Sequence, residues 1–131
     1  NNIKDTYMDT SKKNLVLVVD DVEQNVAVVS QILRSHGYAV MAAFNGETAL
    51  RMLEKRVPDL ILLDIMMPNL DGYSTLDLIK QDEKLKDTKV IFLSAKNNPR
   101  DIEKGLEMGA DAYVTKPYSI KKLMQQIEEM F

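Results

Sequence analysis

The stretch LVLVVDDVEQN, residues 15–25, places five apolar residues directly before two adjacent aspartates, Asp20 and Asp21. A short apolar run without alternation is typical of a strand that is buried on both faces of a sheet. Behind the aspartates, apolar residues recur at helical spacing, at Val22, Val26, Val29 and Leu33. The stretch therefore predicts a buried strand that leads directly into a helix, with two carboxylates at the junction.

Similar apolar runs recur four times further along the chain, at Ala39–Ala43, Leu60–Leu63, Val90–Leu93 and Ala112–Val114. After each run, apolar residues again follow helical spacing: Ala49, Leu53 and Val57; Leu76 and Ile79; Ile102 and Leu106; and Ile120, Leu123, Met124 and Ile127. Alternating buried strands and helices predict one α/β domain. Its sheet would be mostly parallel and doubly wound, with helices on both faces.

Short polar segments separate these elements. The segments HGY, NGE and MGAD, at residues 36–38, 45–47 and 108–111, are typical of helix ends and turns. His36 is interpreted as a cap at the C-terminal end of a helix. The charge-dense segment KQDEKLKDTK, residues 80–89, is predicted to be a solvated loop.

The first residues differ from the rest of the chain. Residues 1–13 are polar and lack periodicity, so they are predicted to be a terminal tail, a linker or the remnant of a tag. Residues 14–131 are assigned to the single domain. Both a stand-alone domain and a part of a larger regulator or hybrid kinase are consistent with this sequence.

The composition argues against several classes of protein. With 131 residues, 45% of them apolar, the chain can build one core of ordinary size. A formal net charge of -3 argues against nucleic-acid binding by this domain itself. No apolar run approaches the roughly 20 residues of a membrane-spanning helix, and a chain without cysteine has no disulfide or thiolate zinc site. We therefore expect a cytoplasmic protein without membrane association.

Polar side chains follow four of the five predicted strands. Asp20 and Asp21 follow the first strand, Asp64 the third, Ser94 the fourth and Lys116 the fifth. Ligands of open parallel sheets bind outside the carboxyl ends of the strands, where these groups would converge. Carboxylates without neighbouring His or Cys favour Mg²⁺ over zinc. Asp64 is the candidate nucleophile for a phosphoryl group, with an ammonium and a hydroxyl nearby to position it.

Each of these side chains also has an ordinary structural interpretation. Asp20 and Asp21 could be a helix N-cap and a first-turn acid. An isolated Ser94 usually caps the next turn, and an isolated Lys116 is usually a solvated surface group. Their occurrence together, at the ends of neighbouring strands, favours the phosphoryl-transfer site.

Four motifs carry a resemblance to a known family: VVDD, LLDIMMPNLDG, FLSA and YVTKP, at residues 18–21, 62–72, 92–95 and 113–117. In this order the motifs resemble those of the receiver domain of two-component response regulators. The resemblance covers residues 14–131. It implies a flavodoxin-like (βα)5 fold, with five parallel strands in the order 2-1-3-4-5.

The resemblance also implies roles for the acidic residues. Asp64 matches the phosphoacceptor of the family. Asp20 and Asp21 match the acidic pair that binds Mg²⁺ together with Asp64, and Met66 occupies the position whose backbone carbonyl is a metal ligand.

Further roles follow from the same resemblance. Lys116 matches the lysine that contacts the phosphoryl group, and the family holds the Lys116–Pro117 peptide bond in the cis form. Ser94 and Tyr113 match the switch pair, in which the hydroxyl moves toward the phosphoryl group and the aromatic ring turns inward.

The function implied is that of a receiver. It would accept a phosphoryl group on Asp64 from a sensor histidine kinase, a phosphotransfer protein or a small phosphodonor, and then control an output domain or partner. It would promote its own phosphorylation and dephosphorylation without turning over an independent substrate, and so is not classed as an enzyme. Dimerisation is expected through the face formed by residues 99–108, 112–114 and 119–130.

Three other functions are less favoured. A haloacid-dehalogenase-like phosphatase would carry an Asp at the position of Met66. A dinucleotide- or flavin-binding module lacks support because no G-x-G-x-x-G follows the first strand. A degenerate receiver that only binds proteins is not supported, because all the key polar positions are filled.

Overall fold

The computed structural model describes residues 13–131, so the predicted tail lies almost entirely outside the described residues. The strands are β1 (Leu15–Val19), β2 (Ala39–Ala43), β3 (Leu60–Leu63), β4 (Lys89–Ser94) and β5 (Ala112–Thr115). The helices are α2 (Glu23–Ser35), α3 (Gly46–Lys55), α4 (Gly72–Lys80), α5 (Pro99–Glu107) and α6 (Ile120–Glu128). Within the described range, no helix is both long and apolar enough to cross a membrane.

The five strands form one sheet in the order β2-β1-β3-β4-β5, and every neighbouring pair is parallel. Each predicted apolar run became a strand at its predicted place, with small differences at the ends of β4 and β5. The predicted fold class and strand order are confirmed. Because the strands are parallel, all of their carboxyl ends lie at one edge of the sheet.

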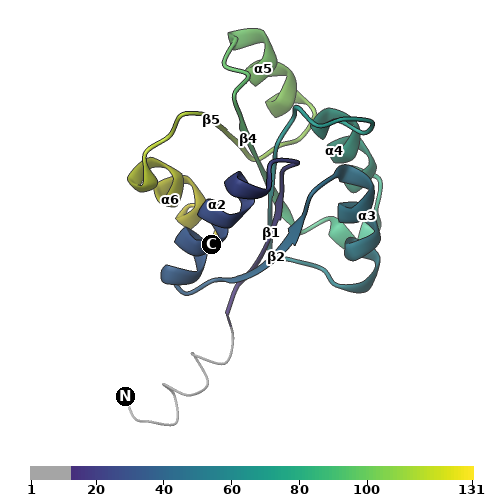
Figure 1. Ribbon diagram of the computed structural model, residues 1–131. Helices are drawn as coiled ribbons and strands as arrows, with labels where there is room; N and C mark the ends of the chain where they lie inside the picture. Colours follow the sequence, from purple (N-terminus) through teal and green to yellow (C-terminus); the bar gives the residue numbers. More distant parts are fainter. Residues whose placement is uncertain (1–12) are drawn as a thin grey trace.

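Helices cover both faces of the sheet, as Figure 1 shows, with α2 and α6 on one side and α3, α4 and α5 on the other. Two buried clusters correspond to these faces. One contains Val18, Leu62 and Leu93 together with residues of α2 and α6. The other contains Leu63 and Phe92 together with residues of α3 and α4. Because both faces of each central strand are buried, the apolar runs in these strands are unbroken and do not alternate between apolar and polar residues.

Side-chain caps fix the starts of four helices. The N-cap side chains of Asn45, Asp71, Asn98 and Ser119 each accept a hydrogen bond from a backbone N–H of the first turn. At the other end of α2, the C-cap residue is His36, and its Nδ1 lies 2.8 Å from the carbonyl oxygen of Ile32. The prediction of a capping histidine is confirmed.

The segment 80–89 corrects one prediction. It is not simply a solvated loop, because Glu83–Leu85 forms a 3-10 turn (η1). Leu85 is buried in the core, and the Thr88 hydroxyl donates a hydrogen bond to the carbonyl of Pro58 at 2.9 Å. One leucine among charged residues is enough to anchor the segment, since its burial removes a whole side chain from water.

The helical spacing was also misleading at some positions. Val57 lies beyond the end of α3 and is 49% exposed, so it does not continue the apolar face of that helix. Leu106 and Ile120 lie on α5 and α6 but are exposed. Helical spacing identifies a face, but it does not tell which of its members lie at the margin of the core.

Candidate functional site

The predicted polar residues meet at the carboxyl edge of the sheet. The parallel register aligns Val19 of β1 with Leu63 of β3, so Asp20 and Asp64 leave their strands side by side. Ser94 of β4 pairs with Thr115 of β5, which places Lys116 at the same edge. Residues that are up to 96 positions apart in sequence therefore contact each other.

Three carboxylates form an acidic cluster at this edge. Oxygen atoms of Asp20, Asp21 and Asp64 all lie within 4.8 Å of one another. Asp20 and Asp64 are only 5% and 7% exposed, whereas Asp21 is exposed. A set of hard oxygen donors with an open side fits Mg²⁺, which keeps several of its waters when it binds to proteins.

Asp20 also has a local structural role. Its Oδ1 accepts a hydrogen bond from the backbone N–H of Val22 at 2.9 Å, just before α2. The N-cap residue of α2 is Val22, however, which has no capping side chain. The alternative in which Asp20 is merely a helix N-cap is therefore wrong in its geometry. The buried carboxylate turns the chain toward α2 and still faces the cluster.

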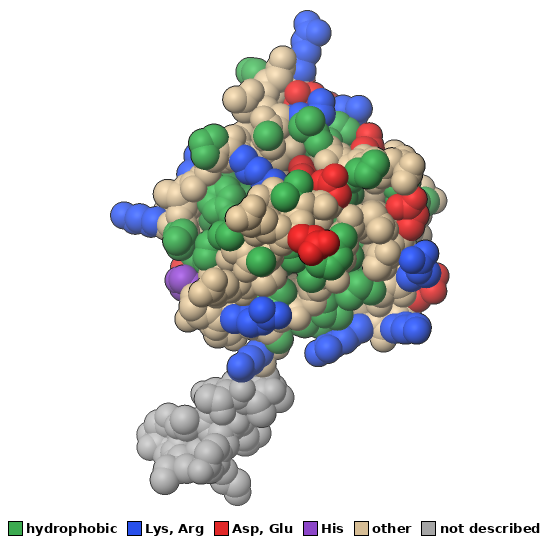
Figure 2. Space-filling view, in the orientation of Figure 1, with side chains coloured by type: hydrophobic (Ala, Val, Ile, Leu, Met, Phe, Trp, Pro, Cys, Tyr) green, Lys and Arg blue, Asp and Glu red, His purple; other side chains and the backbone are tan. Residues whose placement is uncertain are grey.

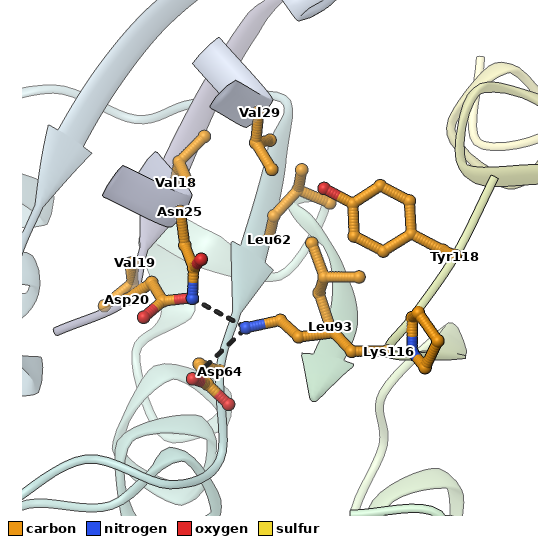
Figure 3. A pocket seen from close by; sticks show the side chains of 11 residues that line it. Val18, Val19, Asp20, Asn25, Val29, Leu62, Asp64, Leu93, Lys116 and Tyr118 are labelled. Carbon is orange, nitrogen blue, oxygen red and sulfur yellow. Dashed lines mark hydrogen bonds and ion pairs between the residues drawn. The ribbon is translucent and has the colours of Figure 1, made fainter. Parts of the chain in front are cut away.

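Lys116 bridges two of the three carboxylates, as Figure 3 shows. Its Nζ lies 2.9 Å from Asp20 Oδ2 and 3.6 Å from Asp64 Oδ2. Burial alone would lower the pKa of Lys116, but the hydrogen bond to Asp20 and the charge of Asp64 outweigh it and raise that pKa. The ammonium is therefore charged at neutral pH. The Lys116–Pro117 peptide bond is cis, as predicted.

The environment of Asp64 disfavours the ionised form of its carboxyl group. Burial raises its pKa above the ordinary value, Lys116 lowers it in part, and the neighbouring Asp20 raises it further. The backbone N–H of Met66 donates a hydrogen bond to Asp64 Oδ1 at 3.3 Å. The Met66 side chain itself is 56% exposed and takes no part in this contact. A divalent cation at the cluster would favour the ionised carboxylate.

Ser94 and Tyr113 approach the site from β4 and β5. Ser94 is fully buried, and its Oγ accepts a hydrogen bond from the backbone N–H of Lys96 at 3.3 Å. The Tyr113 hydroxyl donates to the carbonyl of Lys96 at 2.7 Å. Burial raises the pKa of Tyr113 to about 12, so this hydroxyl stays protonated and remains a donor at neutral pH. Both predicted switch residues therefore contact the backbone of the same residue.

Two residues of the site were not predicted. The Asn25 amide donates to Asp20 Oδ2 at 3.3 Å, and its place in the first turns of α2, shortly after Asp21, was the available signal. Gly72 begins α4 so close to the Asp64 backbone that a Cβ would collide with the Asp64 carbonyl oxygen. Glycine is required there because no side chain fits between helix and strand.

A cavity of about 250 Å³ adjoins the cluster. Its polar end is lined by Asp20, Asn25, Asp64 and Lys116. The remainder is lined mainly by apolar side chains, including that of Leu62, and by Tyr118 (Figure 3). The Lys116 ammonium points from this cavity toward the carboxylates. The reactive groups thus lie in a largely apolar setting, where charges interact more strongly than they do in water.

Known proteins share this sequence pattern. The family model described as response regulator receiver domain matches residues 16–128. The chain belongs to this family. It is a receiver domain, and its function is in two-component signalling.

Relatives of the receiver differ in length. The probable transcriptional regulator ycf27 of Guillardia theta is 41% identical over 120 residues, which are 92% of this chain and 46% of that protein. Response regulator PleD of Caulobacter vibrioides is 36% identical over 88% of this chain and 25% of its own length. Protein PilG of Pseudomonas aeruginosa is 40% identical over 86% of this chain and 84% of its length. The receiver thus spans less than half of the first two proteins and most of the third.

Solved structures agree with the fold. The chemotaxis protein CheY4 of Vibrio cholerae superposes with a TM-score of 0.86 at 27% identity, over 92% of this chain and 100% of that one. The receiver domain of a signal transduction histidine kinase from Syntrophus aciditrophicus gives 0.82 at 33% identity, over 89% of each chain. Receivers of very different proteins therefore share this arrangement of strands.

Proposed function

We propose that Asp64 is the phosphoacceptor of this receiver. The observation that carries the proposal is the position of Asp64, a buried carboxylate that lies beside two further carboxylates and within ion-pair distance of Lys116. A buried anion with a cation beside it is poised to bind a phosphoryl group, since phosphoryl transfer depends mainly on positioning and charge stabilisation. We assign the domain to residues 14–131.

The proposed transfer proceeds by attack of an Asp64 carboxylate oxygen on phosphorus. The P–N bond of a phosphohistidine breaks as the P–O bond forms, and the imidazole leaves with the bonding electron pair. With acetyl phosphate, the bond to the acetate oxygen breaks instead. The product is an aspartyl phosphate, and Lys116 Nζ, already 3.6 Å from Asp64 Oδ2, hydrogen-bonds a phosphoryl oxygen.

The residues of the acidic cluster suit Mg²⁺ in this reaction. Asp20, Asp21 and Asp64 would hold it by their carboxylates, and Met66 by its backbone carbonyl. When bound, Mg²⁺ would neutralise charge on the phosphoryl oxygens. The fold holds three carboxylates close together before any ligand binds. The ammonium of Lys116 reduces the electrostatic repulsion between Asp20 and Asp64.

The proposed switch uses Ser94 and Tyr113. The Ser94 hydroxyl would donate a hydrogen bond to the phosphoryl group. The inward position of Tyr113 is supported by its hydrogen bond to the Lys96 carbonyl and by the packing of its ring against Phe92, with 5.9 Å between ring centroids. Phosphorylation would therefore stabilise an arrangement that this chain can already adopt.

The proposed partners follow from the chemistry. A sensor histidine kinase or a phosphotransfer protein would supply the phosphoryl group, and water would later hydrolyse the aspartyl phosphate, so no independent substrate is turned over. On the face in Figure 2, basic side chains are dispersed among acidic and apolar ones. The expectations that this domain does not itself bind nucleic acid and that it is cytoplasmic stay predictions.

Intact-mass spectrometry tests the proposed function. After incubation with acetyl phosphate and Mg²⁺, the mass should increase by one phosphoryl group. The increase should be absent without Mg²⁺ and in Asp64→Asn, whose amide is a poor nucleophile. Asp77→Asn, which removes an exposed carboxylate from α4, is the matched control and should gain the group like the wild type. Failure of the wild type to gain mass would instead favour a receiver that acts only by binding proteins.

A further inference from the structure

Three aromatic rings form a continuous row beneath α5. Tyr73 of α4 packs edge-to-face on Phe92 of β4, with 5.6 Å between ring centroids and 71° between ring planes. Phe92 in turn packs on Tyr113 of β5, with 5.9 Å between centroids. Tyr73 is 8% exposed and Phe92 is fully buried. The row therefore links a tyrosine of α4, through the core, to the tyrosine of the proposed switch.

The two terminal tyrosines hold the same backbone segment. The Tyr113 hydroxyl donates to the carbonyl of Lys96, and the Tyr73 hydroxyl donates to the carbonyl of Asp101 at 3.1 Å. These carbonyls lie five residues apart, in the segment that leads from β4 into the first turn of α5. The Lys96 ammonium and the Asp101 carboxylate also approach each other at 3.9 Å. The segment is thus attached to the row at both of its ends.

The packing leaves the rings little freedom. A Cβ added to Gly105 of α5 would lie 2.9 Å from one Phe92 ring atom and 3.2 Å from a Tyr113 ring atom. The neighbouring residue of α5 also contacts the row, since Lys104 Nζ lies 4.1 Å from the centre of the Tyr73 ring. Rings in direct contact transmit a displacement to one another, because protein interiors are densely packed. A change at one end of the row is therefore felt at the other.

We propose that Tyr73 is a positioning residue for the Tyr113 switch. By fixing the Asp101 carbonyl and supporting Phe92, Tyr73 keeps the Lys96 carbonyl where the inward Tyr113 hydroxyl can bond to it. Tyr73 acts through the Phe92 ring and the segment 96–101, and it forms no hydrogen bond or ion pair with Asp20, Asp64 or Lys116. The inference rests on the proposed function, since it requires that the inward Tyr113 accompanies phosphorylation.

The test is a double-mutant cycle on the affinity for beryllofluoride, a phosphoryl mimic, in the presence of Mg²⁺. Tyr73→Phe removes the hydroxyl but keeps the ring, so the fold should be retained. The loss of one hydrogen bond should weaken binding by about three- to tenfold. Tyr38→Phe removes a tyrosine hydroxyl from a ring that packs on Phe131, outside the row, and is the matched control with unchanged affinity.

The decisive comparison uses Tyr113→Phe. When Tyr113 has no hydroxyl to donate, Tyr73→Phe should have little further effect, so the two changes should not be additive. Additive effects, or an unchanged affinity in Tyr73→Phe, would overturn the inference while leaving Asp64 as the acceptor. A wild-type protein that binds no beryllofluoride would overturn the inference and the proposed function together.

Discussion

At the level of single residues, the site contains a buried carboxylate, Asp64, whose ionisation lowers the stability of the folded protein. Asp64 is buried and beside Asp20, and both effects raise its pKa, while Lys116 lowers it only in part. The ionised form is therefore less stable in the folded protein than in the unfolded chain. This residue lowers stability at neutral pH, and the cost is consistent with a functional role.

The pH dependence of stability should reveal this cost. Because folding raises the pKa of Asp64, its contribution to stability is fully present below its ordinary value of 3.8. The contribution is lost as pH rises through the higher pKa of the folded state. Asp64→Asn should therefore unfold at higher urea concentration than the wild type at pH 7, in metal-free buffer.

The difference between the two proteins should disappear as the pH falls toward the ordinary pKa of Asp. Asp77→Asn, at an exposed position of α4, controls for the loss of one surface charge. An Asp64→Asn protein that is less stable than the wild type at pH 7 would mean that the attraction to Lys116 outweighs burial.

At the level of elements, the packing of α5 depends on the absence of a side chain at Gly105. Gly105 lies in the interior of α5, where alanine would add up to about 1 kcal/mol of helix propensity. Its Cβ would instead press on the rings of Phe92 and Tyr113, and overpacking of this kind costs about 1–3 kcal/mol. We therefore expect Gly105→Ala to lower the free energy of unfolding by about 1 kcal/mol in urea titration.

Glu107→Ala provides the control for this prediction. Glu107 is an exposed residue of the same helix, so its replacement changes propensity without changing the core. The free energy of unfolding of Glu107→Ala should stay within about 0.5 kcal/mol of the wild-type value. A stabilised Gly105→Ala protein would show that the rings can move aside at little cost.

The elements were predictable to different degrees. All five strands were found because each contains a short apolar run, and a parallel sheet then brings Asp20, Asp64 and Lys116 to one edge. The 3-10 turn was missed because its single apolar residue, Leu85, lies among charged residues. Asn25 and Gly72 were missed although their contacts, with Asp20 and with the Asp64 backbone, are close in sequence, because apolar periodicity does not report polar side-chain contacts or close backbone approach.

At the scale of the whole molecule, the proposed dimer face lies on α5, β5 and α6. Leu106 of α5 and Ile120 of α6 are 44% and 54% exposed on these helices. If phosphorylation promotes association there, light scattering should show twice the monomer mass after treatment with acetyl phosphate and Mg²⁺.

Placing a charge on this face should prevent the association. Leu106→Arg should remain monomeric, while Leu78→Arg, at a comparably exposed leucine of α4, should still dimerise. A monomeric mass of the wild type in both states would contradict the proposed face. If Leu106→Arg still dimerises, the interface must lie on another face of the molecule.

The proposed function requires that this fold present Asp64, and no other group, to a phosphodonor. The most direct measurement is borohydride reduction after treatment with acetyl phosphate and Mg²⁺, because the reduction converts an aspartyl phosphate to homoserine, followed by peptide mass spectrometry. Homoserine is expected at position 64, and none in protein treated without acetyl phosphate. Homoserine at position 20 or 21, or unmodified peptides throughout, would contradict the proposed function.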